Sequence, residues 1–592
     1  MDVLEGHYES VYNARWSHVV EVPGGEGTGM EAYEGEPPQP WTYKEVGDTL
    51  EKDDSVEQSG ALRLRLMVLT SDKAWPYSWG ACEFNRDCYV NCEVERVWQI
   101  VKGVVNKWSS GHGETDFTPD PCVLIGTPGI GKSMAAGSYL LYQLLHYDAE
   151  QLPVVVYYIG DQTFLFDKTT KKLSAYLGKG SVLDVVDRLS WSGVKGYIIY
   201  DVAEEVCRPS VGLPCNRWGM IVITSPNENK YELWENQNLP VHIVMNCPDE
   251  SDVKAMCVWE QRSKPPQQQA EYWREVKGRM DKVGPIPRHI LDEQAYDDRI
   301  EKCHETVEET ISPETQYYTG LGNSTMWGGN SVFHWLAKVV RIREEVCKGE
   351  FSLNLPISDH LCNKTLCMLA KLMKQDDFNL LILRLKHNLV SKNMERCTVF
   401  AFLDAAFITA IRHKLRELKR TARRQPHRSV LEVYSQERPT SHHVLPPPHY
   451  FSEKVGVDCC VLYVPEVEDF PLLDAFFFVN SNPMTLVGLR MTTAGEHHTT
   501  TSTVRQFTEC LAAYFNGWEE LSQELSWEMI YVQHADSTPM NDWQRCDIDN
   551  TDGVSEEEGQ RIAAFWKGKM RQYQLAISPG DFRRDEALRS EA

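Results

Sequence analysis

The residues with the clearest chemistry form a glycine-rich loop, Gly126-Thr127-Pro128-Gly129-Ile130-Gly131-Lys132-Ser133, which leads into a helical pattern at Met134. A short apolar run, Val123 to Ile125, precedes it. The glycines allow positive φ and bring backbone amides close to a polyphosphate. Lys132 supplies a charge for the outer phosphates, and Ser133 supplies a hydroxyl for Mg²⁺. This spacing and context are those of a P-loop, so Gly126 to Met134 predict a nucleotide-binding site.

A carboxylate that follows a second apolar run is the next candidate. The run Gly196-Tyr197-Ile198-Ile199-Tyr200 is typical of a buried strand, and Asp201 stands at its C-terminal end. In P-loop proteins this position holds Mg²⁺ through water, so Asp201 and Ser133 are the predicted metal-binding residues. The catalytic base is less defined, because Val202 follows the aspartate and the nearest acids are Glu204 and Glu205. The sequence therefore predicts binding and leaves hydrolysis open.

Two further segments carry residues that could sense the phosphates. The strand pattern Gly219 to Thr224 is followed by Ser225-Pro226-Asn227. Thr224, Ser225 or Asn227 could contact the γ-phosphate, or these residues could simply form a turn. Arg288 follows a Gly-Pro-Ile-Pro breaker at a helix start. It could reach the nucleotide phosphates or form a surface ion pair.

Composition limits the classes of function. A net charge of −24 over 592 residues argues against a surface that coats nucleic acid, so nucleic acid would need a local basic patch. The N-terminus is charged, and no apolar run reaches the roughly 20 residues of a membrane span. We therefore expect a soluble, intracellular protein without a membrane partner, whose seventeen cysteines are reduced thiols.

Changes in composition and periodicity predict the domain organisation. Apolar strands separated by helices indicate an α/β fold with a parallel sheet covered on both faces. The predicted segments are a disordered N-terminal segment (1–60), a small module (61–114), a P-loop NTPase domain (115–300), a helical region (301–429), a restriction-endonuclease-like α/β domain (430–550), and a C-terminal helix and tail (551–592).

The helical region contains a dense basic stretch at residues 411–428. Phe407, Ile411, Leu415 and Leu418 fall on one face of a helix there, and lysine and arginine cover the rest. Such a basic helix could contact RNA or DNA or serve as a nuclear-import signal. It could equally be a solvated face that meets the acidic surface of the protein.

The C-terminal α/β pattern resembles a nuclease core without its usual chemistry. Asp474 and the segment Arg490 to Thr492 occupy the positions where an acidic residue, a second acid or amide, and a lysine would hold Mg²⁺ and activate water. Arg490 places a cation where a metal should bind, which argues against cleavage. His497 and His498 could substitute for the missing metal-binding residues, but adjacent histidines without a carboxylate partner are more often surface residues.

Several of these stretches together resemble the trypanosomatid retrotransposon hot spot proteins, over about Leu62 to Asn550. They are Gly126 to Gln143, Gly196 to Ala203, Thr224 to Asn227, Met245 to Asp249, and Val487 to His498.

The resemblance implies an ATPase-like P-loop domain related to that of crinkler effectors, joined to a nuclease-like C-terminal domain. It also implies a multigene family with nuclear or perinuclear and some cytoplasmic location, and links to transcription, RNA export and retroelement control. Two positions depart from the family pattern: Glu204-Glu205 stand where relatives carry a basic residue, and Arg490 stands where they carry Gln.

The leading hypothesis is an ATP- and Mg²⁺-binding switch whose nucleotide state controls contacts of the C-terminal domain with nucleic acid, chromatin or transcription proteins. The alternatives are a nucleotide-regulated nuclease and a nuclear interaction scaffold with a vestigial pocket. The choice between ATP and GTP stays open, because the sequence shows no evident guanine-reading motif.

Overall fold

The computed structural model divides the chain into two compact units. The first comprises Met1–Cys303 and Asn323–Ile357, and the second comprises His304–Gly322 and Ser358–Ala592. The structure describes residues 2–22, 27–37, 41, 63–79, 85–110, 119–178, 181–202, 207–214, 217–310, 321, 327, 332–343, 350–373, 396–418, 427–434, 436–448, 454–467, 470–492, 494–535, 537–549 and 555–578.

The first unit is built on an eight-stranded sheet of order β1-β9-β8-β7-β10-β11-β6-β12. Neighbours from β7 to β12 in this order are parallel, while β8, β9 and β1 extend the sheet by antiparallel pairing. The strands are β1 (Asp2–Val3), β6 (Cys122–Gly126), β7 (Val154–Ile159), β8 (Gln162–Asp167), β9 (Lys172–Leu177), β10 (Gly196–Asp201), β11 (Trp218–Thr224) and β12 (Val241–Met245).

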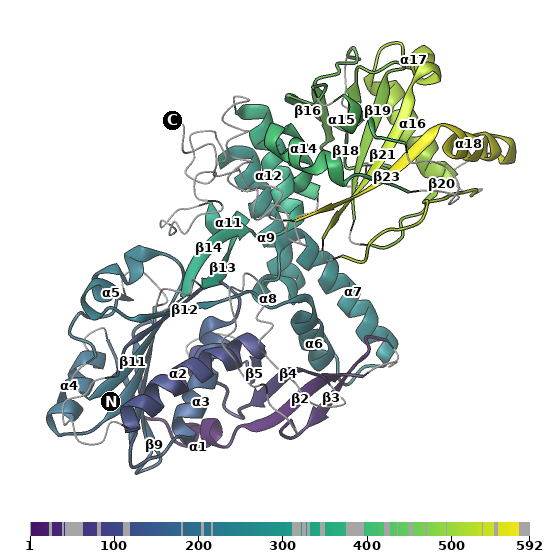
Figure 1. Ribbon diagram of the computed structural model, residues 1–592. Helices are drawn as coiled ribbons and strands as arrows, with labels where there is room; N and C mark the ends of the chain where they lie inside the picture. Colours follow the sequence, from purple (N-terminus) through teal and green to yellow (C-terminus); the bar gives the residue numbers. More distant parts are fainter. Residues whose placement is uncertain are drawn as a thin grey trace, which may run out of the picture. The chain divides into compact units, whose positions relative to one another are not determined.

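Helices cover both faces of this sheet (Figure 1). Leu124 of β6 packs in the core formed with α2 (Cys92–Ser110) and α3 (Ser138–His146). Its neighbour Val123 packs on the other face, with α4 (Ser181–Trp191) and α5 (Glu232–Asn238). β6, β10 and β11 are buried along their whole length, as strands covered on both faces must be. The predicted α/β class, with a parallel sheet between helices, is confirmed.

Residues 2–22 and 27–37 are folded, which corrects the prediction of disorder for this part of residues 1–60. β2 (Arg15–Glu21) and β3 (Met30–Glu34) join β4 (Arg63–Thr70) and β5 (Asp87–Val90) in a four-stranded sheet of order β3-β2-β4-β5. β1 pairs with β9 of the large sheet, and α1 (His7–Tyr12) follows it. The sequence suggested disorder because its local composition is rich in Gly and Glu. The strand β2 is instead stabilised by pairing with β4, which lies far along the chain. Residues 38–40 and 42–62 lie outside the described part.

A group of helices completes the P-loop region. α6 (Glu250–Glu260), α7 (Pro266–Val283), α8 (Pro287–Ile290) and α9 (Glu293–Glu305) follow β12 along the chain. Val253 and Cys257 of α6 share a core with Val276 and Met280 of α7 and with Ile290 of α8. α6 begins with a capping box, in which Asp249 and Asp252 each accept the backbone N–H of the other.

A β-hairpin follows, where the sequence predicted only helix. β13 (Ala337–Arg343) and β14 (Glu350–Pro356) pair antiparallel and belong to the first unit, so the helical assignment of 301–429 is wrong there. α11 (Phe333–Leu336) precedes them. Lys338 and Arg341 of β13 are buried, and the strand is defined by its pairing with β14 and not by a local sequence pattern.

The second unit contains a seven-stranded mixed sheet of order β15-β23-β21-β19-β18-β17-β16. β17, β18 and β19 are antiparallel neighbours, whereas β19, β21 and β23 run parallel. The elements are α12 (Asp359–Leu372), α14 (Ala405–Ile411), β15 (Arg416–Glu417), α15 (Val430–Val433), β16 (Ser441–Leu445), β17 (Val461–Pro465), β18 (Ala475–Val479), β19 (Thr485–Met491), α16 (Thr501–Tyr514), α17 (Trp518–Glu524), β21 (Ser526–His534), α18 (Glu556–Lys569) and β23 (Met570–Ile577).

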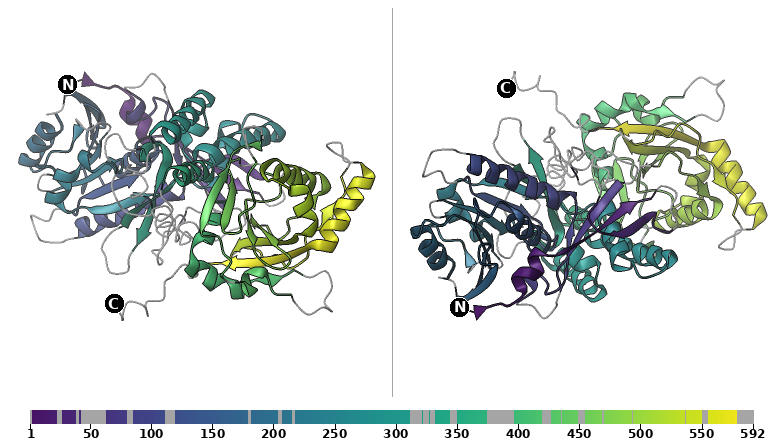
Figure 2. Two further views of the ribbon diagram at one scale, coloured as in Figure 1. Left: turned by 90° about the horizontal axis from the view of Figure 1, so that it is seen from above. Right: turned by 90° about the horizontal axis from the view of Figure 1, so that it is seen from below.

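Two predictions for this unit need correction. The single basic helix over 411–428 is wrong: α14 ends at Ile411, a 3₁₀ turn covers Arg412–Lys414, and β15 pairs with β23. Residues 419–426 lie outside the described part. The segment 551–592 is also not merely a helix and tail, because α18 leads directly into β23, both yellow in Figure 2. β23 pairs with β21 over its whole length.

Within the described ranges, no helix is both long and apolar enough to cross a bilayer.

Candidate nucleotide-binding site

The predicted P-loop joins the end of β6 to the helix that contains Lys132. Gly129 and Gly131 have φ of 86° and 99°, values that strain any residue with a Cβ. At Gly126, a Cβ would stand 2.7 Å from the carbonyl oxygen of Met245. The chain after Gly131 forms a π-helical turn, Lys132–Gly137, before α3. The glycines are therefore required by the geometry of the loop.

The Lys132 ammonium lies over its own loop. Its Nζ donates to the carbonyl oxygens of Gly126 at 2.7 Å and Thr127 at 2.8 Å. Burial lowers the pKa of Lys132 to about 7, although the Asp201 carboxylate opposes this shift. The ammonium is thus held at the mouth of the loop by weak neutral acceptors, which phosphate oxygens can replace with stronger charged ones.

Asp201 lies at the end of β10, as predicted, with 3% of its surface exposed. Burial raises the pKa of Asp201 to about 6, and a hydrogen bond with the Ser133 side chain and the charges of Lys132 and Lys230 counter this. Its Oδ2 has no hydrogen-bond partner among the described residues. The structure therefore brings the two predicted metal-binding residues, Ser133 and Asp201, together and leaves a buried oxygen for a ligand.

The candidate phosphate sensors follow β11, which pairs with β6 on one side and β10 on the other. Thr224 and Ser225 line the same cavity as the P-loop, and neither hydroxyl has a hydrogen-bond partner among the described residues. Asn227 instead accepts the backbone N–H of Asn229, which is the turn-forming alternative. The geometry favours Thr224 and Ser225 over Asn227 at the site.

Arg288 also lines this cavity, from α8. Its backbone N–H donates to the carbonyl oxygen of Gly129 at 3.4 Å, and its Nη2 donates to the Tyr77 hydroxyl at 3.1 Å. A Cβ at Gly129 would stand 2.7 Å from Ile286 Cγ2. The helices that follow β12 thus touch the P-loop, and Arg288 lies at the point of contact.

The cavity has a volume of about 660 Å³, within the roughly 300–1,000 Å³ typical of small-molecule sites. Sequence reasoning missed several of its residues. Lys230 lies six residues after the end of β11, the strand that carries the candidate phosphate sensors. Its presence in the cavity could have been inferred from that closeness in sequence. Asp87 and Glu260 come from segments distant in sequence and carried no recognisable signal. Glu204 and Glu205 lie outside the described residues, so the predicted base is not located.

Comparison with known families decides the relationship. Residues 123–419, half of the chain, match the family described as retrotransposon hot spot protein, P-loop domain. Residues 8–120 match the family described as retrotransposon hot spot proteins N-terminal. The chain belongs to the retrotransposon hot spot protein family. No curated protein matches it.

The P-loop domain of this retrotransposon hot spot protein is a nucleotide-binding domain. The N-terminal match also spans β2 and β3, consistent with their being folded.

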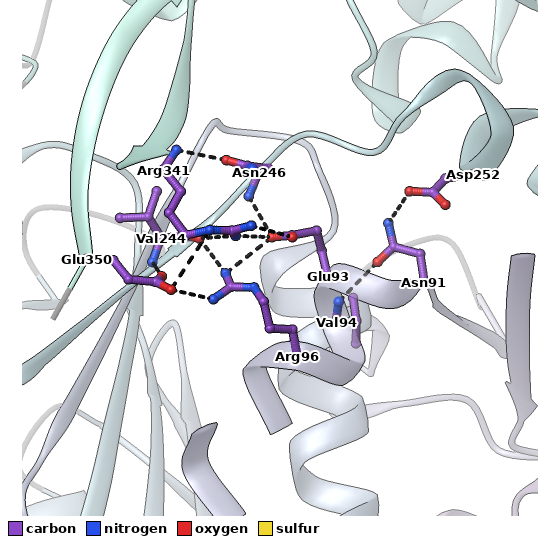
Figure 3. A network of polar contacts seen from close by, with 9 residues as sticks. All are labelled: Asn91, Glu93, Val94, Arg96, Val244, Asn246, Asp252, Arg341 and Glu350. Carbon is purple, nitrogen blue, oxygen red and sulfur yellow. Dashed lines mark hydrogen bonds and ion pairs between the residues drawn. The ribbon is translucent and has the colours of Figure 1, made fainter. Parts of the chain in front are cut away.

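A buried ionic network that the sequence did not reveal holds the hairpin against β12 and α2 (Figure 3). Arg341 of β13 binds Glu93 of α2 through two N–H groups, at 2.7 and 3.0 Å. Arg96 of α2 binds Glu350 of β14 at 2.6 Å and the carbonyl oxygen of Val244 at 2.6 Å. Burial alone would raise the pKa of Glu93, but the two guanidinium groups hold it at about 2. Glu93 is therefore charged near neutral pH.

The same hairpin reaches the P-loop. The backbone N–H of Val339 donates to Thr127 Oγ1 at 2.9 Å, and that of Arg341 donates to Asn246 Oδ1 at 2.9 Å. Thr127 is the second residue of the loop and is 1% exposed. The ionic network thus fixes a strand that directly contacts the nucleotide-binding loop.

In the second unit, the predicted nuclease-like residues also come together. Arg490 Nη1 lies 3.1 Å from Asp474 Oδ1, and its Nε donates to His497 Nε2 at 3.2 Å. The second oxygen of Asp474 accepts the backbone N–H of Met491 at 2.7 Å. His497 is therefore half-buried against Arg490, not a plain surface residue, and burial and Arg490 lower its pKa. No group of three or more His, Cys, Asp or Glu among the described residues could hold a metal ion.

Proposed function

We propose that this retrotransposon hot spot protein binds Mg²⁺-ATP and acts as a nucleotide-controlled switch. The observation that carries the proposal is the cluster of buried polar atoms at the mouth of the P-loop. Asp201 Oδ2 and the hydroxyls of Thr224 and Ser225 lack hydrogen-bond partners in the described structure, although such groups are normally satisfied. A bound metal and triphosphate would satisfy all of them.

Each residue has a distinct role in this proposal. The amides of the P-loop and the Lys132 ammonium would bind the phosphates. Ser133 and Asp201 would hold Mg²⁺, which neutralises charge on the outer phosphates. Thr224 and Ser225 would donate hydrogen bonds to the terminal phosphate. Arg288 would connect the phosphates to α8, the helix to which it belongs. Loss of that phosphate would then change contacts between β11, α8 and the loop.

Hydrolysis is the second part of the proposal. Glu204 and Glu205 are the nearest carboxylates in sequence after Asp201, and either would serve to orient the attacking water. If one of them does so, replacing both with Gln stops phosphate release while leaving Mg²⁺-ATP affinity within about twofold. Unchanged phosphate release would assign the water-orienting role elsewhere.

Titration calorimetry tests the binding proposal. Wild-type protein should bind ATP more tightly with Mg²⁺ than with EDTA, and Asp201→Asn should lose that difference because it removes a metal ligand. Asp184→Asn provides a control, since Asp184 is exposed on α4 and does not line the cavity. Equal affinities with Mg²⁺ and EDTA in the wild type would refute the metal-dependent site.

For the second unit, we propose a nuclease-like framework that contacts nucleic acid, chromatin or transcription proteins without cleavage. Three antiparallel strands, a helix and a fourth strand parallel to the third support the framework. The Asp474–Arg490 pair supports the loss of cleavage, because a guanidinium already neutralises the carboxylate that would bind a metal. Cleavage of labelled DNA or RNA by the full chain with Mg²⁺ or Mn²⁺, lost in Asp474→Asn, would overturn this proposal in favour of the nuclease.

The basic stretch at 411–428 remains the proposed nucleic-acid contact and nuclear-import signal, although it is not one helix. Binding of labelled RNA or DNA should weaken with salt, and the triple change of Arg420, Arg423 and Arg424 to Ala should reduce the salt dependence. A tagged protein should lose its nuclear or perinuclear location with the same changes. Unaltered binding and location would remove this segment from the proposal.

A further inference from the structure

The cavity at the P-loop has two chemically different ends. Among the described residues that line it, the cations are Lys132, Lys230 and Arg288. Lys230 and Arg288 both act electrostatically on Lys132, so the positive charges gather at the phosphate end. The carboxylates Asp87, Glu260 and Asp292 line the cavity as well, and they come from β5, α6 and the start of α9.

Neutral hydrogen-bond donors hold the carboxylates of the acidic end in place. Asp87 accepts from Trp259 Nε1 at 2.8 Å and from Thr70 Oγ1 at 2.6 Å. Glu260 accepts from the hydroxyls of Tyr89 at 3.3 Å and Tyr272 at 2.9 Å. Neither carboxylate forms an ion pair with a described residue. Because a carboxylate offers about four acceptor positions, each retains acceptor capacity toward the cavity.

Several contacts place the acidic end where the nucleoside would lie. The Tyr272 hydroxyl also donates to the carbonyl oxygen of Leu291, at 3.1 Å, which connects Glu260 with the segment before Asp292. Cys88 Sγ lies 3.4 Å from the carbonyl oxygen of Ala135, which places β5 beside the first turn of the P-loop helix. A nucleotide whose phosphates occupy the P-loop extends past this turn. Apolar lining is supplied here by Val94, Met134, Met256 and Leu291.

We infer that Asp87, Glu260 and Asp292 form the nucleoside-binding part of the site and select ligands by their hydrogen-bond donors. The donors are the exocyclic amine of the base or the ribose hydroxyls, because carboxylates accept hydrogen bonds and repel carbonyl oxygens. β5 belongs to the region that matches the N-terminal family domain. That domain therefore supplies part of the nucleotide site and is not a separate module. The inference rests on the proposed function.

Nucleotide analogues separate the two kinds of donor. Calorimetry with the full chain and Mg²⁺ would compare ATP with ITP, which carries a carbonyl in place of the amine, with 2′-deoxy-ATP, and with inorganic triphosphate. ATP should bind at least about tenfold more tightly than one of the two nucleotide analogues, as expected for a lost hydrogen bond to a charged group. A weakened ITP identifies the amine as the donor, and a weakened 2′-deoxy-ATP identifies the 2′-hydroxyl.

Two conservative variants test the carboxylates themselves. Asp292 caps α9 by accepting the N–H of Ala295 at 2.7 Å, and Asn preserves this cap, so Asp292→Asn should fold. Asp292→Asn or Glu260→Gln should reduce the preference for ATP over the weaker analogue at least about threefold and leave triphosphate affinity unchanged. Glu271→Gln, at an exposed position on α7 away from the cavity, is the matched control.

The outcomes distinguish this inference from the proposed function. If ATP, ITP and 2′-deoxy-ATP bind within twofold of one another, or if the variants keep the wild-type preference, the inference is overturned and the proposed function stands. If neither ATP nor triphosphate binds, both fall.

Discussion

Asp201 occupies an environment that disfavours its own charge in the absence of a ligand. Its pKa of about 6 lies above the ordinary 3.8, so the folded state binds this proton more tightly than the unfolded state. The stability that this group contributes is present below about pH 4 and is lost as the pH rises through about 6. The buried Asp201 carboxylate is therefore expected to lower the free energy of unfolding at neutral pH.

Asp201→Asn should consequently stabilise the nucleotide-free protein while abolishing its response to Mg²⁺. The raised pKa of Asp201 corresponds to a gain of about 1–3 kcal/mol in the free energy of unfolding at pH 8 when the carboxylate is removed. The gain is limited because the Lys132 charge already offsets part of the cost of burying the carboxylate. Denaturant unfolding at pH 8 measures this gain. A variant less stable than the wild type would mean that the carboxylate is satisfied within the protein itself.

Glu528 predicts a pH dependence in the second unit. It is 2% exposed in β21, where burial raises its pKa to about 7 from 4.5, and the Ser429 hydroxyl and Val430 N–H counter this shift. The folded state holds the proton more tightly, so this contribution to stability is present below pH 4.5 and is lost as the pH rises to about 7.

Replacing Glu528 with Gln should remove that loss. Relative to the wild type, Glu528→Gln should gain about 2–3 kcal/mol in unfolding free energy between pH 4.5 and pH 8. Denaturant unfolding at the two values measures this difference, and Glu524→Gln on the exposed surface of α17 should retain the wild-type dependence. A parallel pH response of Glu528→Gln and wild type would contradict the assignment.

Among single residues, the sequence predicted those that belong to a short motif of neighbouring residues. Gly126 to Ser133 and Asp201 lie where their motifs placed them, because each motif ends a strand whose neighbours are fixed by a parallel sheet. Asp87 and Glu260 could not be predicted, since they reach the cavity only through the pairing of β4 with β5 and the packing of α6.

Among the elements, the hairpin β13–β14 is held in place by buried ion pairs, whereas most elements are held by apolar contacts. Arg341 is fully buried and binds Glu93, and a buried carboxylate that loses its partner is strongly destabilising. Arg341→Met should therefore lower the unfolding free energy by about 3–5 kcal/mol. Adding Glu93→Gln should recover part of the loss, because the uncompensated charge is removed.

Denaturant unfolding of the single and double variants measures this coupling. Arg15→Met breaks the exposed pair with Asp72 and should cause no measurable change. If Arg341→Met were as harmless as Arg15→Met, the network would not hold the hairpin.

The elements that sequence reasoning missed share a physical cause. Arg341 of β13 binds Glu93 and Arg416 of β15 binds Asn541, both far along the chain, so no local pattern revealed these strands. β23 was missed because its place beside β21 is fixed by long-range parallel pairing. By contrast, β10 and β11 were predicted almost to the residue, because strands buried on both faces are continuous apolar runs.

At the scale of the whole molecule, the chain passes from the first unit into the second, returns once, and passes into the second again. The chain leaves the first unit after Cys303, returns to it from Asn323 to Ile357, and then continues into the second unit. The returning segment carries Val339 and Arg341, which contact Thr127 and Glu93. The segment that contacts the P-loop is therefore joined in sequence, at both of its ends, to residues of the second unit.

The central claim is that the P-loop cavity binds a magnesium nucleotide, and thermal unfolding with and without Mg²⁺-ATP tests it most directly. A ligand that binds only the folded state at 100 times its Kd adds about 2.7 kcal/mol, which raises the Tm by several degrees. The account predicts this rise in the wild type and its loss in Lys132→Ala, while Lys254→Ala, on α6 outside the cavity, responds like the wild type. No rise in the wild type, or an equal rise in Lys132→Ala, would contradict it.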